Sequence, residues 1–241
     1  MSLEQKDSKN IRRLLLHEMK EGIFSNSARL PRETELSEQL GISRTQLRDA
    51  LADLEREGYI TRRHGVGTLI NRHVLQVKNR MDIETEFLDI IRQSGYEPQV
   101  VSVQAKENRA GACSAEKLGI PEDAEVLRIF RVCTADGHPA IFCEDVLEKR
   151  IIRRSYCQKD LEMPIFQFLK EFCGISAYMD LTELHAVPAD DRTAKALNIP
   201  KGTPVLNMEE VDYDIEGRRI FYSSQYFADE LLKQTVLRKK L

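Results

Sequence analysis

The sequence predicts an α+β protein in which a small helical domain precedes a larger domain with an antiparallel sheet. Three observations predict this class. Leucines between positions 36 and 54 recur at three- and four-residue steps, the period of helices with one buried face. Two later β-rich stretches turn at Asp136-Gly137 and Glu216-Gly217, which is typical of β-hairpins. Residues 115–132 also resemble residues 194–211, so the two hairpins are expected to join one sheet.

Composition limits the classes of function. The chain has 241 residues, 41% of them hydrophobic, which is enough for two domains with their own cores. A net charge of −3 argues against a protein that coats nucleic acid along its whole length. Five cysteines without a CxxC pair predict reduced thiols rather than a disulfide framework or a zinc site. The polar N-terminus and the lack of an apolar run of membrane length predict a cytoplasmic protein with no membrane partner.

The first elements are expected to be helices. A first helix is predicted over residues 7–24. Pro31 prevents it from continuing, and Glu33 is favourable in the first turn of a second helix. Gly41 ends that helix, and Ser43 can cap a third by accepting a backbone N–H bond. Two helices around a three-residue turn with a glycine make a helix-turn-helix.

The third helix carries the candidate DNA-reading residues. Arg44, Thr45 and Arg48 occupy its N-terminal turns, with the two arginines on one face opposite the leucine stripe. In a DNA-binding helix-turn-helix, these turns of the second helix meet base edges in the major groove. Arginine is the side chain that donates two hydrogen bonds at once to guanine.

A short hairpin is predicted after this helix. Its two β-rich runs surround Gly65-Val66-Gly67, and the segment from Thr61 to His73 contains no acidic residue. It would present only positive charge to a phosphate backbone. The alternative is an ordinary three-helix domain with its arginines on a solvated face, where arginine usually lies. The combination of a capped helix, paired arginines and an acid-free hairpin favours DNA binding.

The pattern LPxExELSxxLGxSRTxLRxALxxLExEGYIxRRxGxGT resembles the winged helix-turn-helix of the GntR family of bacterial transcription regulators. The resemblance assigns residues 1–70 to a DNA-binding domain. It implies that Arg44 and Arg48 contact bases and phosphates and that Gly65, at the wing tip, enters the minor groove. Thr34 stands where many members carry arginine, and Arg32 lies two positions earlier. The candidate DNA-binding residues are Arg32, Thr34, Ser43, Arg44, Thr45, Gln46, Arg48, Arg63, His64, Gly65 and Gly67.

The remaining chain is expected to form a linker and a second domain. Residues 71–80 are polar and are interpreted as the linker, and residues 81–241 as the second domain. Its first helix lies within residues 83–95 and is followed by a strand at 98–109. Each copy of the repeat then supplies a short helix and a hairpin. Between the copies, residues 160–174 predict a helix with a buried face formed by Ile165, Phe168, Leu169 and Phe172.

The order of these segments resembles the UTRA effector domain of the HutC subfamily. The resemblance rests on LGIPEDAEVLRIFRVCTADGHPAIFCEDVL, PIFQFLKEFCGI and LNIPKGTPVL and covers roughly residues 80–235. It implies a chorismate-lyase-like α/β domain with an antiparallel sheet that binds a small metabolite. Relatives that respond to phosphosugars tend to have Ser-Phe-Thr where this chain has Glu86-Phe87-Leu88, so a sugar phosphate is not the expected effector.

Strand alternation predicts where the effector binds. Leu127, Ile129 and Arg131 share one face of a strand, and a cation among apolar neighbours needs a partner. The repeat and the return strands are expected to bring further polar residues to that face, as in a small-molecule site. The alternative is a structural ion pair of Arg131 with Glu144 or Glu210 and no ligand. The candidate effector-binding residues are Arg131, Glu144, Glu210, Tyr222, Ser224 and Tyr226.

These features predict a transcription regulator, expected to be a repressor, whose binding to double-stranded operator DNA responds to a small-molecule effector. A homodimer is implied by the resemblance and because one recognition helix reads too few base pairs for genomic specificity. One alternative is a chorismate-lyase-like enzyme fused to a DNA-binding domain. However, no catalytic residue, metal site or cofactor motif is evident, since the five histidines lack ligand spacing. A second alternative is an architectural nucleic-acid protein that is indifferent to metabolites.

Overall fold

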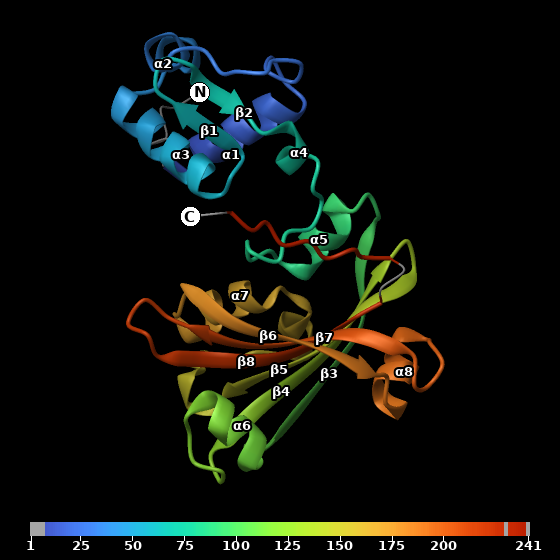
Figure 1. Cartoon of the computed structure of the whole chain (residues 1–241). Coiled ribbons are helices and arrows are strands. Elements are labelled where there is room, and N and C mark those ends of the chain that lie inside the picture. Colours follow the sequence, from blue (N-terminus) through green and yellow to red (C-terminus); the bar gives the residue numbers. More distant parts are fainter. Residues whose placement is uncertain (1–7, 229–230, 240–241) are drawn as a thin grey trace. The chain divides into compact units, whose positions relative to one another are not determined.

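The structure, a computed structural model, describes residues 8–228 and 231–239 (Figure 1). The chain forms two compact units. The first comprises the chain up to Asp82 together with the segment from Thr235 onward, and the second comprises Ile83–Gln234. The described helices include none with the length and apolarity needed to cross a bilayer. All five cysteines are free thiols.

The first unit is a winged helix-turn-helix. Its elements are α1 (Ser8–Lys20), α2 (Glu33–Leu40), α3 (Arg44–Arg56), β1 (Ile60–Arg63), β2 (Gly67–Ile70) and α4 (Arg72–Leu75). Helix α1 ends before the expected residue 24. Gly41 closes α2 with a φ of +61°, the left-handed conformation that glycine adopts most easily. The three main helices pack around one core that includes Ile11, Leu15, Met19, Leu36, Leu47, Leu51 and Leu54.

Residues 71–80 do not form the polar linker expected from their composition. They contain α4, and Leu75 at its end joins the core of the first unit. The Arg72 guanidinium donates hydrogen bonds to backbone carbonyls in and after α1, including that of Ser27 at 2.6 Å. The polar composition of this segment predicted that it would be solvated. Composition alone could not show that Arg72 binds carbonyl groups about 50 residues earlier in the chain.

The C-terminal segment also differs from the predicted domain boundaries. The carbonyl of Thr235 accepts a hydrogen bond of 2.8 Å from the N–H of Met81. Lys239 Nζ donates to the carbonyls of Glu55 (2.6 Å) and Arg56 (2.7 Å), at the end of α3. The segment from Thr235 onward therefore belongs to the first unit rather than to the second.

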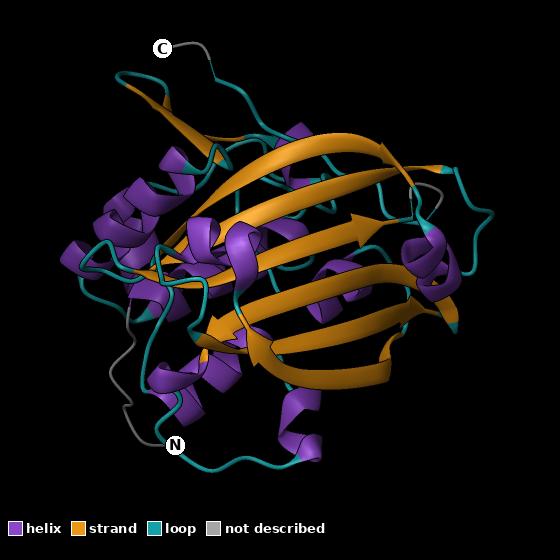
Figure 2. Cartoon of the chain, turned by 90° about the horizontal axis from the view of Figure 1, so that it is seen from below, coloured by secondary structure: helices purple, strands orange, loops and turns teal. Residues whose placement is uncertain are grey.

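The second unit contains a six-stranded antiparallel sheet with the strand order β3-β4-β5-β8-β7-β6 (Figure 2). Its elements are α5 (Phe87–Gln93), β3 (Pro98–Arg109), α6 (Gly111–Leu118), β4 (Glu125–Ala135), β5 (His138–Glu148), η1 (Lys149–Ile151), η2 (Gln158–Glu162), α7 (Ile165–Phe168), η3 (Leu169–Cys173), β6 (Met179–Pro188), α8 (Asp191–Leu197), β7 (Pro204–Tyr213) and β8 (Arg219–Phe227). The repeat is visible in the strand order, because β3-β4-β5 and β6-β7-β8 lie on either side of the sheet centre. Strand β6, the counterpart of β3, was not predicted.

Each hairpin of the sheet contains one extra residue. In the β4–β5 hairpin, Thr134 pairs with Pro139, whereas Cys133 pairs with Ile141. The register of the β7–β8 hairpin shifts by one residue next to Asp212. Side chains alternate between the faces of a sheet, so a bulge of one residue moves every later side chain of the return strand to the opposite face.

Helices cover both faces of the sheet (Figures 1 and 2). Helices α5 and α7 pack on the face that carries Leu127, Ile129 and Arg131, which we call the Arg131 face. Helices α6 and α8 pack on the other face, which carries Phe142 and Tyr222 and which we call the Glu144 face. Ligand-binding residues on one face are therefore separated from those on the other by the sheet itself.

Candidate nucleic-acid interface and effector site

The recognition helix α3 begins with a capping box. The Gln46 N–H donates to Ser43 Oγ at 3.2 Å, and the Ser43 N–H donates to Gln46 Oε1 at 3.3 Å. Ser43 and Gln46, two of the predicted DNA-binding residues, thus provide hydrogen-bond acceptors for free backbone N–H groups at the start of the helix. The cap leaves Arg44 and Thr45 exposed at the start of α3.

The predicted DNA-reading arginines are accessible. Arg44 is exposed and makes no ion pair with another described residue. The Arg48 side chain is 69% exposed, and its nearest carboxylate is that of Glu33 at 3.9 Å. By contrast, Arg62 is held by a 2.7 Å hydrogen bond from its Nε to Glu55. Arg32, which precedes α2, and Thr34, in its first turn, are also exposed, so both helices of the helix-turn-helix present donors to solvent.

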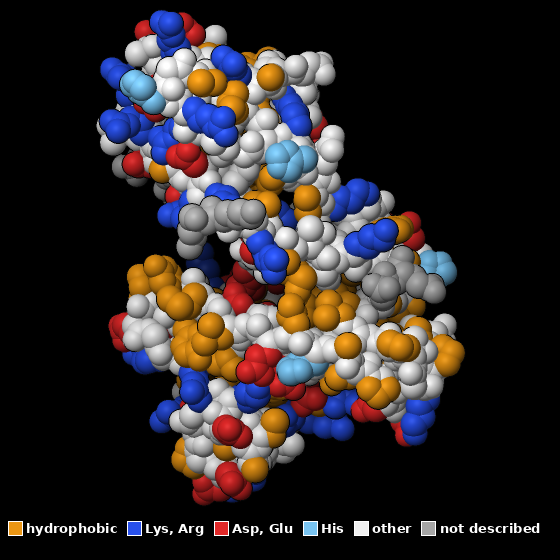
Figure 3. Space-filling view, viewed as in Figure 1, with side chains coloured by type: hydrophobic (Ala, Val, Ile, Leu, Met, Phe, Trp, Pro, Cys, Tyr) orange, Lys and Arg blue, Asp and Glu red, His pale blue; other side chains and the backbone are white. Residues whose placement is uncertain are grey.

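The wing is the hairpin of β1 and β2. Gly65 and Gly67 have φ values of +74° and +98°, which side chains with a Cβ rarely adopt. Arg63 and His64 are exposed beside them. The tip is supported by Arg29, whose Nη1 donates to the Val66 carbonyl at 3.1 Å; the sequence analysis did not identify this residue. Figure 3 shows Lys and Arg side chains gathered over this unit.

In the second unit, Arg131 is a buried cation with one unused donor. It is 4% exposed, its Nη1 contacts the Asp145 carboxylate, and its Nε donates to the Leu161 carbonyl at 3.1 Å. Its Nη2 has no partner among the described residues. Asp145 also accepts a 2.7 Å hydrogen bond from Ser223. Burial raises the pKa of Asp145, and the charge of Arg131 opposes that rise. The ion pair thus involves Asp145, not Glu144 or Glu210.

A small cavity lies beside Arg131. Its volume is about 20 Å³, room for about one water molecule. A larger groove of about 330 Å³ includes Lys170, and Glu86 lines both spaces. Burial raises the pKa of Glu86 to about 7. The lining of the cavity is otherwise mostly apolar and consists of Phe87, Leu88, Val100, Cys133, Glu162, Met163, Pro164 and Ile165.

The six predicted effector-binding residues do not converge on one face, so that prediction is wrong. In the register of β4 and β5, Arg131 lies opposite Cys143, and Glu144 lies opposite Phe130. Residues opposite each other point to the same face, so Arg131 and Glu144 point to different faces. Arg131 and Glu210 lie on the Arg131 face, whereas the other four point to the Glu144 face. The two bulges explain the error, because a hairpin without a bulge would have placed all six together. The residues on the Glu144 face are Glu144, Tyr222, Ser224 and Tyr226.

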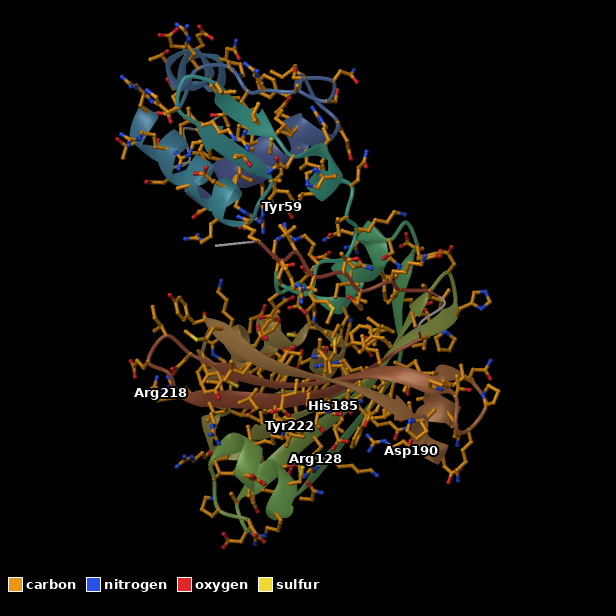
Figure 4. The ribbon with its side chains drawn as sticks, in the orientation of Figure 1. Tyr59, Arg128, His185, Asp190, Arg218 and Tyr222 are labelled. Atoms are coloured by element: carbon orange, nitrogen blue, oxygen red, sulfur yellow. The ribbon has the colours of Figure 1, made fainter. Side chains whose placement is uncertain are left out.

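Polar groups on the Glu144 face already have protein partners. Glu144 accepts hydrogen bonds from Arg128 (2.8 Å) and Arg192 (3.0 Å). Ser224 Oγ accepts from Asn207 at 3.1 Å. Figure 4 shows Arg128 and Tyr222 on the side of the sheet that α6 covers. These contacts stabilise the packing of α6 and α8 on the sheet.

A winged helix-turn-helix joined to a sheet domain, in which a buried arginine borders a mostly apolar cavity, is the architecture of a DNA-binding regulator with a ligand-binding domain. Residues 7–70 match the profile described as "Bacterial regulatory proteins, gntR family", and residues 93–232 match "UTRA domain". The chain therefore belongs to the UTRA family, as a GntR-type transcription regulator whose DNA binding is modulated by a metabolite.

Related proteins have the same class of function. The chain is 24% identical over 232 residues to the "Probable fructoselysine utilization operon transcriptional repressor" of Escherichia coli (strain K12), covering 95% of this chain and 93% of that protein. It is 28% identical over 132 residues to the "Uncharacterized HTH-type transcriptional regulator YurK" of Bacillus subtilis (strain 168), and here the match spans 55% of this chain and 54% of that protein. These relatives are regulators, so the enzyme alternative does not hold.

A solved structure shares the fold. The crystal structure of the "possible transcriptional regulator YydK" from Bacillus subtilis subsp. subtilis str. 168 superposes with a TM-score of 0.77. The sequence identity is 19%, and the match covers 96% of this chain and 99% of that chain. The two-part architecture with a winged helix-turn-helix and an antiparallel sheet domain is therefore confirmed.

Proposed function

We propose that the chain binds operator DNA as a homodimer and that an effector bound on the Arg131 face changes this binding. The location of the effector site is supported by Arg131, a buried guanidinium beside a cavity, whose Nη2 has no hydrogen-bond partner among the described residues. A buried donor without an acceptor is costly, and a ligand acceptor would remove that cost.

The exposed residues suggest distinct roles in DNA binding. Arg44 and Arg48 are proposed to read base edges, since they lie in the first turns of α3. Ser43 and Gln46 contribute through the cap that holds these turns. The other exposed residues are proposed to contact backbone phosphates and the minor groove, namely Arg32, Thr34, Thr45, Arg63, His64, Gly65 and Gly67.

The small number of base pairs that one recognition helix can read supports the proposal of a homodimer. One α3 helix contacts only a few base pairs, whereas specific sites need more contacts than one module makes. Two copies would place their recognition helices in half-sites separated by about 34–36 Å or a multiple of it. The corresponding operator has two related halves.

The effector is proposed to carry both an acceptor and a donor. Arg131 would donate to an anionic or carbonyl group of the effector, and Glu86 would accept from a hydroxyl or N–H group. Ligand cavities usually measure about 300–1,000 Å³, so a cavity of about 20 Å³ is a closed state. Binding must move the segments that line it, and this differential affinity for an open state is what can shift DNA binding.

The test is an operator-release assay with the full chain. Metabolites that raise the melting temperature are added to a complex with labelled operator DNA, and release is followed by fluorescence anisotropy. A variant with Arg131→Met and Asp145→Asn should bind the operator normally but respond only at about ten- to a hundredfold higher metabolite concentration. Arg128→Gln, on the Glu144 face, is the matched control and should respond as the wild type does. The reverse pattern would contradict the assignment of the effector to the Arg131 face.

A further inference from the structure

The Arg131 face also carries an acidic cluster that neither DNA binding nor the cavity uses. We propose that Glu84, Glu210 and Asp212 bind a hard divalent cation, of the class of Mn²⁺, Mg²⁺ and Ca²⁺. Glu210 and Asp212 are two residues apart on β7, so their side chains point to the same face. Glu84 comes from the segment before α5.

The geometry fits one ion. One carboxylate oxygen from each of the three residues lies within 4.8 Å of the corresponding oxygens of the other two. Oxygen ligands lie at about 2.3–2.6 Å from Ca²⁺ and about 2.0–2.1 Å from Mg²⁺, so any two ligands of one ion are at most about 4–5 Å apart. Small side-chain adjustments therefore suffice to bring all three onto one cation. Glu84 is exposed, which provides an entry path from solvent.

Asp212 is the buried carboxylate of this cluster that lacks a partner of opposite charge. Its side chain is 0% exposed, and among the described residues its carboxylate oxygens meet only the Glu210 carboxyl group, with which they can hydrogen-bond only by sharing a proton. Buried charges in proteins are paired with opposite charges or coordinate metals. When the three acids are ionised, the Asp212 oxygens face carboxylates that cannot donate a hydrogen bond.

The surrounding charges give no compensation. The charges that act most strongly on Glu84 and Asp212 are all acidic, namely those of Glu210 and Asp180 and, for Glu84, also that of Glu86. A cation bound between the three carboxylates would offset this repulsion.

The chemistry of the donors selects the class of ion. All three donors are carboxylate oxygens, which suit Mg²⁺, Ca²⁺ and Mn²⁺, whereas zinc and copper sites favour imidazole and thiolate ligands. The expectation of no metal site came from histidine and cysteine spacing alone. Carboxylates at positions 84, 210 and 212 meet only because β7 and the segment before α5 lie together in the fold.

A second cluster provides a matched control. Glu183, His185 and Glu209 lie close together on the Glu144 face, and they are more exposed than the buried pair on β7. Lys117 Nζ already lies 2.8 Å from Glu209 and 3.3 Å from Glu183, which neutralises part of their charge. Glu183→Gln therefore removes an acid from β6, the strand next to β7, without touching the proposed site.

The experiment is a titration of the full chain with Mn²⁺, followed by electron paramagnetic resonance, in which bound Mn²⁺ loses the signal of the free ion. We expect one Mn²⁺ per chain. Asp212→Asn should weaken Mn²⁺ binding by about tenfold or more, and Glu183→Gln should leave it unchanged. Glu84→Gln, at an exposed position, should weaken binding as well and serves if Asp212→Asn does not fold.

Thermal unfolding gives a second readout. Mn²⁺ should raise the melting temperature of the wild type and of Glu183→Gln, but not that of Asp212→Asn. Without metal, Asp212→Asn should melt no lower than the wild type, because it removes a buried repulsive carboxyl group. If the wild type binds no Mn²⁺ at millimolar concentration, or if Asp212→Asn binds it equally well, the cluster is balanced by shared protons and the proposal is wrong.

Discussion

At the scale of single residues, Arg131 contributes to packing and offers a donor to a ligand. It neutralises Asp145 and donates to the Leu161 carbonyl, while Nη2 has no partner. Removing one member of a buried ion pair leaves the other charge uncompensated, which usually costs about 3–5 kcal/mol. Arg131→Ala should therefore lower the free energy of unfolding by that amount, as measured by urea denaturation.

The pH dependence of this loss has a defined sign. Burial raises the pKa of Asp145, and in Arg131→Ala the opposing cation is absent. A carboxyl group with a raised pKa binds more protons in the folded state, so its folded state loses stability as pH rises. The deficit of Arg131→Ala should thus be larger at about pH 8 than at about pH 5. Adding Asp145→Asn should recover most of the stability at both; no recovery would mean that the two side chains are not coupled.

Arg48 is the residue whose predicted role is base reading. Arg48→Ala should cost about 1–3 kcal/mol on the specific operator and less on scrambled DNA, because a base contact distinguishes sequences. Fluorescence anisotropy on both DNAs measures the two losses. Arg56→Ala, in the last turn of the same helix, is the control and should change neither. Equal losses of Arg48→Ala on both DNAs would assign Arg48 to a phosphate.

At the scale of elements, the wing can be tested separately from the fold. A Cβ at Gly65 would meet no atom within 4 Å, so Gly65→Val adds only the strain of its positive φ, of the order of 1–3 kcal/mol. The branched side chain would block approach to a narrow groove, and operator affinity should fall. Gly137→Val, at another open turn with φ +83°, should lose similar stability and keep operator affinity. A wing variant that binds normally would show that the wing stays outside the groove.

The elements also show what the sequence can predict. Strand β3 has the predicted bounds of residues 98–109, and Gly41 and Ser43 end and begin their helices as expected. These features depend on local periodicity and on single residues. The faces of β5 and β8 depend instead on the two hairpin bulges, which have no compositional signature. The pairing of Arg131 with Asp145 and the location of the cavity could therefore not be predicted.

At the scale of the whole molecule, the chain passes between its two units twice, near residue 83 and near residue 234. Strand β8 lies at the centre of the effector sheet and leads into the segment that begins at Thr235. Its last described residue contacts the recognition helix: Lys239 Nζ donates to the carbonyls of Glu55 and Arg56. A cation at this end also complements the helix dipole. The C-terminal segment thus connects the effector sheet to α3 by a route separate from residue 83.

Truncation after Gln234 tests whether this second connection transmits the effector signal. Without effector, operator affinity should change little, because Arg44, Arg48 and the wing lie elsewhere in the first unit. Allosteric coupling typically changes affinity by about 5- to 150-fold, and it acts equally in both directions. In the truncated chain, the effect of effector on operator affinity and of operator on effector affinity should therefore shrink by the same factor. Anisotropy with effector and calorimetry with operator measure the two factors.

Lys239→Gln should reduce both coupling factors by less than the truncation does, because it removes the charge at the end of α3 and keeps the chain connection. Undiminished coupling after truncation would instead place the signal in the segment around residue 83, which leads directly to Glu86 at the cavity.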